Sequence, residues 1–200
     1  MKLRKLRIDL LKLLFVPILF VVVFVRPSWS LDSYRAFFVE FLGYLFLLSG
    51  LTVRIWCIFY IGGRKTKELI TEGPYSICRN PLYVGTFLLS IGVGLCFENL
   101  LMLLLVPAVI IPVHFLTVIM EESHLKERFG TAYLEYQRRV PRFWPRFSAY
   151  QSPEYVEVNV KAVRRIALDT IGVLLLPQVE DFLELLHEHN ILPVFWHFPS

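Results

Sequence analysis

Residues 82–120 read LYVGTFLLSIGVGLCFENLLMLLLVPAVIIPVHFLTVIM, two apolar runs separated by only two polar residues. A transmembrane helix needs about 20 predominantly apolar residues, with a range of about 17–25. The runs at residues 82–97 and 100–120 approach or reach that length. Because Glu98 and Asn99 leave room only for a tight reversal of direction, this stretch predicts an antiparallel pair of transmembrane helices.

Two further apolar runs precede this pair, at residues 10–25 and 36–61. The chain has 200 residues, 56% hydrophobic and 19% charged, whereas soluble domains have roughly 45–50% and 25%. This composition excludes a disordered, collagen-like or coiled-coil protein. It predicts an all-α integral membrane protein with about four transmembrane helices and a cytoplasmic helical C-terminal segment. The expected parts are residues 1–62 with two spans, 63–147 with the helical hairpin and its polar motifs, and 148–200 as a C-terminal extension.

Lys and Arg residues cluster on one side of the expected spans. They lie at the N-terminus, after residue 61 and after residue 120, whereas the hairpin link has none. Because cytoplasmic loops carry the excess of Lys and Arg, both termini of this multi-pass protein are expected in the cytoplasm. No nucleic-acid partner is expected, since the basic residues form no known binding module. The first run also has the outline of a signal peptide, so its cleavage stays open.

The C-terminal extension has a helical pattern. Residues 156–189 are expected to be helical with an interruption at Pro177, because proline breaks a helix interior. Acidic side chains lie opposite an apolar stripe, and an acidic helix is a poor ligand for anionic lipid. We therefore expect the stripe to dock on protein. Its members follow the i, i+3, i+4, i+7 spacing of a helix face: Val179, Phe182, Leu183 and Leu186.

Two polar segments border the hairpin, TEGPYSICRNPLYVG at residues 71–85 and EESHLKERFGTAYLEYQRRVPR at residues 121–142. Arg79 can pair with a carboxylate or a phosphate. Glu121 and Glu122 are adjacent at the end of a span, where carboxylates are costly to desolvate without cationic partners. These residues predict a binding site at the membrane edge, although an interfacial anchor and a helix end emerging into water are alternative interpretations.

Taken in order and at their spacing, six motifs resemble the isoprenylcysteine carboxyl methyltransferase family of integral-membrane methyltransferases. They are GPY, RNPLYVG, EESHL, RFG, YLEY and RRVPR, within residues 69–146. The wider group includes phospholipid and small-thiol methyltransferases. The resemblance implies that S-adenosylmethionine binds without a Rossmann fold, between the last spans and the cytoplasmic segment, and that its methyl group passes to an acceptor.

The resemblance also implies which residues hold this cofactor. Arg79 and Asn80 suit its carboxylate and Glu121 suits its ammonium, while an aromatic ring can face a sulfonium as it faces other cations. The residues expected to bind the cofactor are Leu69, Ile70, Tyr75, Arg79, Asn80, Pro81, Leu82, Tyr83 and Glu121.

Two positions depart from the family pattern. Many members have His where this chain has Asn80, which cannot titrate. Carboxyl-methylating members have Arg four residues before the glutamate, where this chain has Thr117, with His114 one turn earlier. His114 and Thr117 are expected at the acceptor, and a prenylcysteine carboxylate is expected to be a poor substrate. The acceptor is expected to be a lipidic or small apolar carboxylate, thiol or amine, and Glu122 is the candidate base for an amine.

Two other functions stay open: a non-catalytic membrane scaffold of the same fold, and a relative of nicotinamide-dependent membrane reductases, which are expected to be much longer. Membrane lipid is the expected surrounding of the chain, and protein partners are not predicted. No metal site is expected, because three widely spaced cysteines match neither a disulfide framework nor a zinc site. They are Cys57, Cys78 and Cys96.

Overall fold

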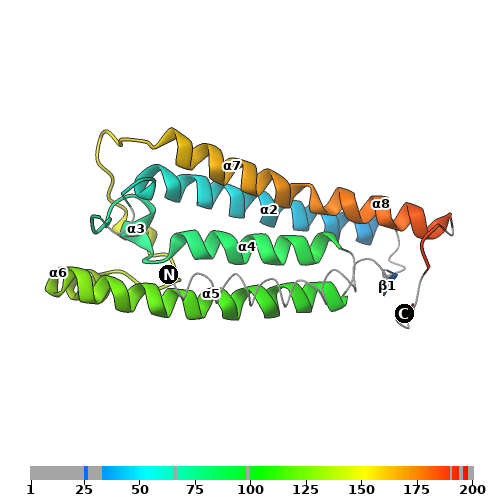
Figure 1. The fold of residues 1–200 in the computed structure, drawn as a ribbon, viewed down its shortest axis with the longest axis horizontal. Coiled ribbons are helices and arrows are strands. Elements are labelled where there is room, and N and C mark those ends of the chain that lie inside the picture. Colours follow the sequence, from blue (N-terminus) through cyan, green and yellow to red (C-terminus); the bar gives the residue numbers. More distant parts are fainter. Residues whose placement is uncertain are drawn as a thin grey trace. The chain divides into compact units, whose positions relative to one another are not determined.

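The computed structural model describes residues 25–26, 33–64, 67–97, 100–189, 191–193 and 196–197. Its three longest apolar helices are α2 (Ser33–Ile61), α4 (Pro81–Cys96) and α5 (Leu100–Phe129), shown in Figure 1. The remaining elements are α3 (Pro74–Ile77), α6 (Thr131–Arg139), the 3-10 helix η1 (Phe147–Ala149), α7 (Val160–Leu174), α8 (Leu176–Glu188), and the two-residue parallel strands β1 (Val25–Arg26) and β2 (Trp196–His197). The helical architecture is confirmed, with this strand pair as the one unexpected addition among the described residues.

Two helices are long and apolar enough to cross a membrane, at Tyr34–Ile61 and Leu100–Phe129. The expected third span forms α4, whose 16 residues extend about 24 Å. The expected first span, at residues 10–25, lies almost wholly outside the described residues. The count of four spans therefore stays a prediction. The helix α5 continues to Phe129, well beyond the expected end of the span at Met120.

The chain divides into two compact units. Unit 1 comprises Met1–Leu48, Phe87–Val113 and Gly172–Ser200, and unit 2 comprises Ser49–Thr86 and His114–Ile171. The helices α2, α4, α5 and α7 each contribute residues to both units. The units group residues by spatial contact, so the expected parts at residues 1–62, 63–147 and 148–200 stay a prediction.

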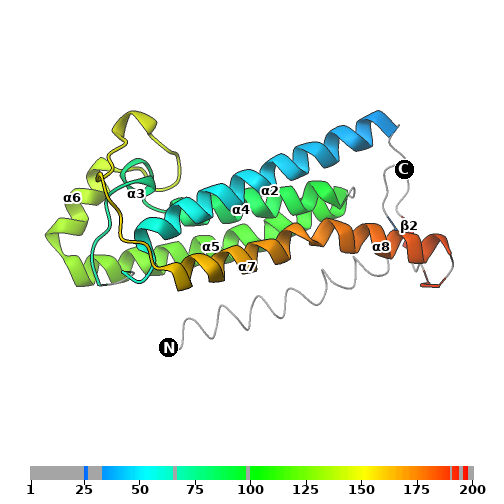
Figure 2. The ribbon, with the colours of Figure 1, turned by 90° about the horizontal axis from the view of Figure 1, so that it is seen from above.

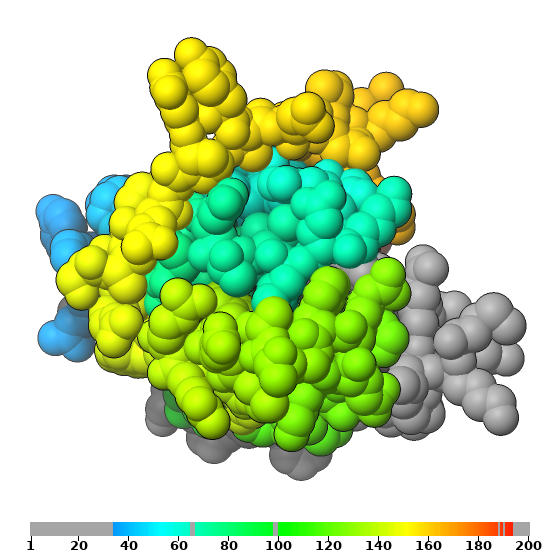
Figure 3. All heavy atoms as spheres, turned by 90° about the vertical axis from the view of Figure 1, so that its left-hand side faces the viewer, coloured from blue at the N-terminus to red at the C-terminus, as the bar shows by residue number. Residues whose placement is uncertain are grey.

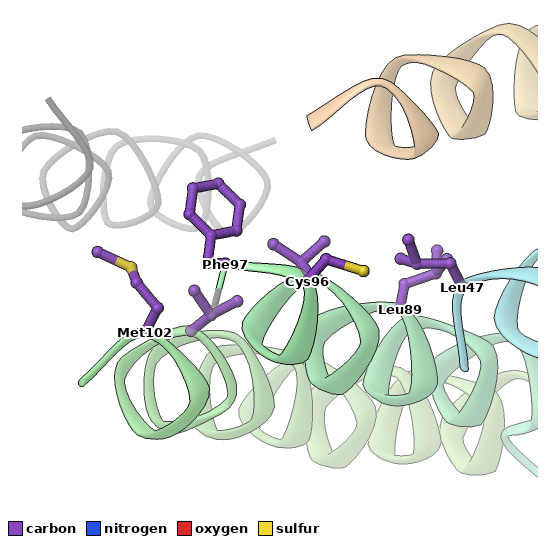
Figure 4. Packing of buried hydrophobic residues seen from close by; sticks show 7 residues of the cluster. Leu47, Leu89, Cys96, Phe97 and Met102 are labelled. Atoms are coloured by element: carbon purple, nitrogen blue, oxygen red, sulfur yellow. The ribbon is translucent and has the colours of Figure 1, made fainter. Parts of the chain in front are cut away.

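Unit 1 is held together by close helix approach and apolar side chains (Figure 4). A Cβ atom on Gly92 would lie 2.8 Å from Cγ of Leu47 and 2.9 Å from the backbone oxygen of Gly43. Small residues allow such approach between α2 and α4, and this matters where lipid provides no hydrophobic drive for helix association. The buried residues around this contact are Leu47, Leu89, Val93, Cys96, Phe97, Met102 and Val106.

Unit 2 contains two smaller clusters rich in tyrosine. One joins Cys57 and Tyr60 of α2 to Tyr75 of α3, and the other joins Tyr133 and Tyr136 of α6 to Val140. Figures 1 and 2 show α3 and α6 side by side. In Figure 3, α6 and the adjoining end of α5 (yellow-green) border the segment around α3 (cyan-green).

The C-terminal extension forms two helices whose break and buried face both differ from expectation. The break falls at Leu175, two residues before Pro177, because proline is accepted in the first turn of a helix but not in its interior. On α8, Glu180 and His187 are buried, whereas Val179 and Phe182 of the expected docking stripe are 50% and 58% exposed. The stripe is therefore covered only in part, because Leu183 and Leu186 are half-buried.

Candidate functional site

The segment before α4 is clamped to the segment after α6 by backbone hydrogen bonds. The N–H of Arg79 donates to the carbonyl of Pro141 (2.8 Å), and the N–H of Arg146 donates to the carbonyl of Ile77 (3.0 Å). Gly73 begins this segment with a φ of 58°, and the ring of Tyr60 occupies the space that a Cβ atom would need there. The two motif-rich segments of the sequence therefore form one structural element of unit 2.

Glu122 is the centre of this clamp. Its carboxylate is buried and accepts hydrogen bonds from Nη2 of Arg142 (2.7 Å) and Nδ2 of Asn80 (2.8 Å). Nη1 of Arg79 lies 3.6 Å away, at ion-pair distance. The hydrogen bonds to Glu122 raise the pKa of the Arg142 guanidinium. The two arginines therefore neutralise the Glu122 carboxylate, which is costly to desolvate without cationic partners.

A cleft of about 720 Å³, counted to its open mouth, lies beside the clamp. Its walls come from the end of α2, the segment before α4, the first turn of α4, the end of α5, and α6. They consist of Ile61, Glu68, Leu69, Ile70, Tyr75, Arg79, Asn80, Leu82, Tyr83, Glu121, His124, Leu125, Tyr133 and Tyr136.

Glu121 presents one of the two carboxylates of the cleft wall, and Glu68 presents the other. Glu121 accepts a hydrogen bond from the hydroxyl of Tyr83 (2.9 Å). The Tyr83 ring also meets the ring of His114 edge to face, with 5.9 Å between centroids. The adjacent glutamates therefore have different surroundings, because Glu122 pairs with arginines inside the clamp while Glu121 borders the cleft.

The cleft wall also contains donors without an acceptor. Nε of Arg79 and the hydroxyl of Tyr75 are buried and make no hydrogen bond within the described part of the chain, and Nη1 of Arg79 has its ion pair with Glu122 but no hydrogen bond there. An unsatisfied buried polar group costs about 1–3 kcal/mol. Both side chains line the cleft, so a bound anionic or carbonyl oxygen is the kind of group that would satisfy them.

Three tyrosines of the cleft wall remain neutral at physiological pH. Burial, and to a smaller extent the charge of Glu122, raise the pKa of Tyr133 to about 12. Burial likewise raises the pKa of Tyr75 and of Tyr136. The hydroxyl of Tyr136 donates to the carbonyl of Tyr75 (2.8 Å). These rings therefore provide apolar faces and hydrogen bonds rather than a phenolate base.

The structure brings eight of the nine expected cofactor residues into one cleft wall. The exception is Pro81, which begins α4. Glu122, His114 and Thr117 do not line the cleft, although His114 contacts Tyr83. Residues that the sequence analysis did not assign are Ile61, Glu68, His124, Leu125, Tyr133 and Tyr136. The tyrosines were recognisable as an i, i+3 pair on one helix face within the YLEY motif.

The sequence matches the family model described as phospholipid methyltransferase over residues 12–132. The chain belongs to this family of membrane methyltransferases. The match includes most of the cleft wall, and the expected relationship to the isoprenylcysteine methyltransferases is confirmed. The Schizosaccharomyces pombe protein-S-isoprenylcysteine O-methyltransferase is 30% identical over 83 residues, which are 40% of this chain and 35% of that enzyme.

Two bacterial relatives match more of the chain. The nickel-cobalt-cadmium resistance protein NccN of Alcaligenes xylosoxydans xylosoxydans is 31% identical over 189 residues, 94% of this chain and 88% of that protein. The cobalt-zinc-cadmium resistance protein CzcN of Cupriavidus metallidurans is 35% identical over 139 residues, 70% of this chain and 64% of that protein. The likeness to NccN therefore extends beyond the part matched by the family model.

Proposed function

We propose that this protein transfers the methyl group of S-adenosylmethionine to a lipidic or small apolar acceptor. The observation that carries the proposal is the pairing of opposite charges in one cleft wall: the carboxylate of Glu121 and the buried donors of Arg79 without an acceptor. The methionine end of the cofactor has the complementary groups, an ammonium and a carboxylate. Membership in a methyltransferase family supports the same conclusion.

The residues of the cleft have separate roles in this proposal. Glu121 accepts the ammonium, and Tyr83 orients the Glu121 carboxylate through its hydroxyl. Arg79 and Tyr75 donate to the cofactor carboxylate. Tyr133 and Tyr136 provide neutral aromatic faces beside the apolar side chains of Leu69 and Leu125.

S-adenosylmethionine supplies a methyl group on a sulfonium, a leaving group that is already activated. The protein therefore needs to orient the two reactants and exclude water, and a protein nucleophile is unnecessary. We assign Glu122 a positioning role, because its carboxylate is engaged by Arg142 and Asn80 away from the cleft. An amine acceptor then has to arrive unprotonated or lose its proton to another group.

The acceptor is proposed to approach along α5, where His114 contacts Tyr83. Thr117 stands where carboxyl-methylating relatives have a cation, and a buried carboxylate without a partner is unfavourable. An apolar thiol or a lipid amine is therefore preferred over a prenylcysteine carboxylate. The Lys and Arg residues around the cleft support a position at the cytoplasmic membrane surface.

Calorimetry on the detergent-purified protein tests the cofactor. Replacing Glu121→Gln keeps the shape but removes the charge, and hydrogen bonds to charged groups contribute about 1.5–3 kcal/mol. Affinity for S-adenosylmethionine should fall roughly ten- to a hundredfold. Glu127→Gln, at an exposed position of the same helix, should bind as the wild type does. Equal affinity of both variants would refute the site, and binding of a nicotinamide dinucleotide instead would favour a reductase.

The NccN likeness favours a second candidate, a contribution to metal resistance. Its 94% coverage of this chain includes the C-terminal extension, where the family model does not reach. Growth on nickel, cobalt or cadmium, compared between cells with the wild-type protein and cells with the Glu121→Gln variant, distinguishes resistance through methyl transfer from resistance through a scaffold. Resistance lost with Glu121→Gln links it to methyl transfer, whereas resistance retained would indicate the scaffold interpretation.

A further inference from the structure

The C-terminal helices contact α2 at successive levels within each unit. In unit 2, Gly62 lies against Ala162, since a Cβ on Gly62 would be 3.3 Å from Cβ of Ala162. Closer to the start of α2, the Arg54 guanidinium interacts electrostatically with the Asp169 carboxylate of α7. In unit 1, the amide of Gln178 bonds to the hydroxyl of Tyr44. As residue numbers rise in the C-terminal helices, those of their partners in α2 fall.

Such opposite numbering is expected when the C-terminal helices run antiparallel to α2. Gly62 and Tyr44 are separated by 18 residues, about 27 Å along a helix, and a hydrocarbon core is about 30 Å thick. Neither α7 nor α8 alone has the length of a span. Together they cover residues 160–188, enough for about 43 Å.

The faces of these helices are only partly inverted relative to those of a helix in water, since Asp169 and Asp181 are exposed. Glu180, His187 and Thr170 are buried in the protein. Each helix also exposes large apolar residues along a stripe, with Leu168 of α7 and Phe182 of α8 each 58% exposed. Further members of the stripe are Ile171, Leu175, Val179 and Leu185. In unit 1, α2 likewise exposes large apolar side chains, among them Phe37, Phe38, Phe41 and Leu45.

The charges follow the pattern of a membrane crossing. Lys161, Arg164 and Arg165 lie in the first turns of α7, and the chain contains no Lys or Arg after Arg165. Lys and Arg collect on the cytoplasmic side of a span. The charge of Asp169, which is exposed, acts electrostatically on Arg54, and Arg54 donates to the hydroxyl of Thr86 (2.6 Å). Charged groups in a span are tolerated when they pair within the protein.

We propose that α7 and α8 together cross the membrane as one broken span, whose exposed apolar stripe contacts lipid acyl chains. Residues before α7 then lie on the same side as the cleft, and residues after α8 lie on the opposite side. This differs from the cytoplasmic C-terminus expected from the sequence, and it does not depend on methyl transfer.

Cysteine labelling with a membrane-impermeant maleimide tests the crossing. The native cysteines are at most 3% exposed, so single exposed positions can be added to the full chain. Glu157→Cys precedes α7, and Ile191→Cys follows α8. Lys67→Cys is the reference for the cleft side, and Tyr34→Cys, at the start of α2, is the reference for the other side. We expect residue 157 to be labelled with residue 67, and residue 191 with residue 34. Labelling of residue 191 together with residue 67 would overturn the proposal.

Spin labels in liposomes test what covers the stripe. A nitroxide at Phe182→Cys should collide with oxygen, which concentrates in lipid, and be protected from a water-soluble nickel complex. Phe41→Cys on α2 is the lipid-facing comparison, and Trp144→Cys, 86% exposed outside the spans, is the water-facing comparison. Collision with the nickel complex would place the stripe in water. Protection from both reagents would indicate a second copy or another protein, and either result would refute the lipid contact.

Discussion

Units 1 and 2 share the same long helices but hold them together differently. In unit 1, α2 and α4 meet at Gly43 and Gly92 and are surrounded by apolar side chains. In unit 2, the same two helices are joined by the hydrogen bond of Arg54 to Thr86. There α4 is joined to α5 by the hydrogen bond of Tyr83 to Glu121.

The difference shows why the cleft lies in unit 2. Apolar contacts between small residues bring backbones together and leave no hydrogen-bonding capacity for a ligand. In unit 2, α2 and α4 also approach closely, since a Cβ on Gly85 would lie 3.0 Å from the backbone oxygen of Gly50. The polar contacts added there leave donors such as Nε of Arg79 without a hydrogen-bond acceptor. Stability in unit 1 should therefore depend on volume, whereas stability in unit 2 should depend on charge.

The largest effect is expected at the clamp of unit 2. Glu122→Ala leaves Arg79, whose side chain is 9% exposed, without its carboxylate, and breaking a buried ion pair costs about 3–5 kcal/mol. The free energy of unfolding in detergent should fall by that amount. Glu127→Ala, exposed on the same helix, should stay within about 0.5 kcal/mol of wild type. Similar values for both variants would show that the clamp contributes nothing.

The same position distinguishes positioning from catalysis. Glu122→Gln keeps a hydrogen-bond acceptor for Asn80 but loses the charge that faces Arg142. As a positioning residue, it should weaken cofactor affinity and leave the pH profile of methyl transfer unchanged. Loss of a pH-dependent step with normal cofactor affinity would instead identify Glu122 as the base.

A smaller effect is expected from added volume in unit 1. Gly92→Ala places a methyl group against Leu47 and the Gly43 backbone, and overpacking costs about 1–3 kcal/mol. Gly172→Ala is the matched control, because no atom lies within 4 Å of its added Cβ. That change should stabilise by about 0.4–1 kcal/mol through the unfolded state. Equal effects of the two changes would contradict the close approach of α2 and α4.

The smallest effects concern the tyrosines of unit 2. Tyr136→Phe removes the hydrogen bond to the Tyr75 carbonyl and should cost about 0.5–1.5 kcal/mol. Tyr155→Phe, at a position 83% exposed, is the control and should have no measurable effect. The comparison is made by denaturant titration of both variants beside the wild type, and identical midpoints would argue against the bond.

Tyr133 should add a pH dependence in alkali. Its pKa rises from the model-compound value of 10.0 to about 12 in the folded protein, so folding favours the protonated phenol. The stabilisation is complete below pH 10 and is lost as pH rises through 12. The unfolding free energy should fall over this range, less steeply in Tyr133→Phe than in wild type. The same slope in both proteins would show that the phenol titrates normally.

Patterns along the chain predicted the helices well and the site in part. Apolar runs of sufficient length predicted α2, α4 and α5, and motif spacing predicted most of the cleft wall. Glu121 and Glu122 show the limit of such patterns, because two adjacent carboxylates look alike in sequence. Only the position of Arg142, 20 residues along the chain, separates a clamped carboxylate from one that borders a cleft.

By itself, the sequence determined the helical class, the apolar lengths and the membership in a methyltransferase family, because these depend on composition and on local spacing. The tertiary structure alone decided which face of α8 is buried and which donors of Arg79 lack an acceptor. Amphipathic periodicity identifies two faces of a helix but not their surroundings, since in lipid the apolar face turns outward and the polar face inward. Contacts between distant segments, such as α2 with α8, show which residues of α8 meet the protein.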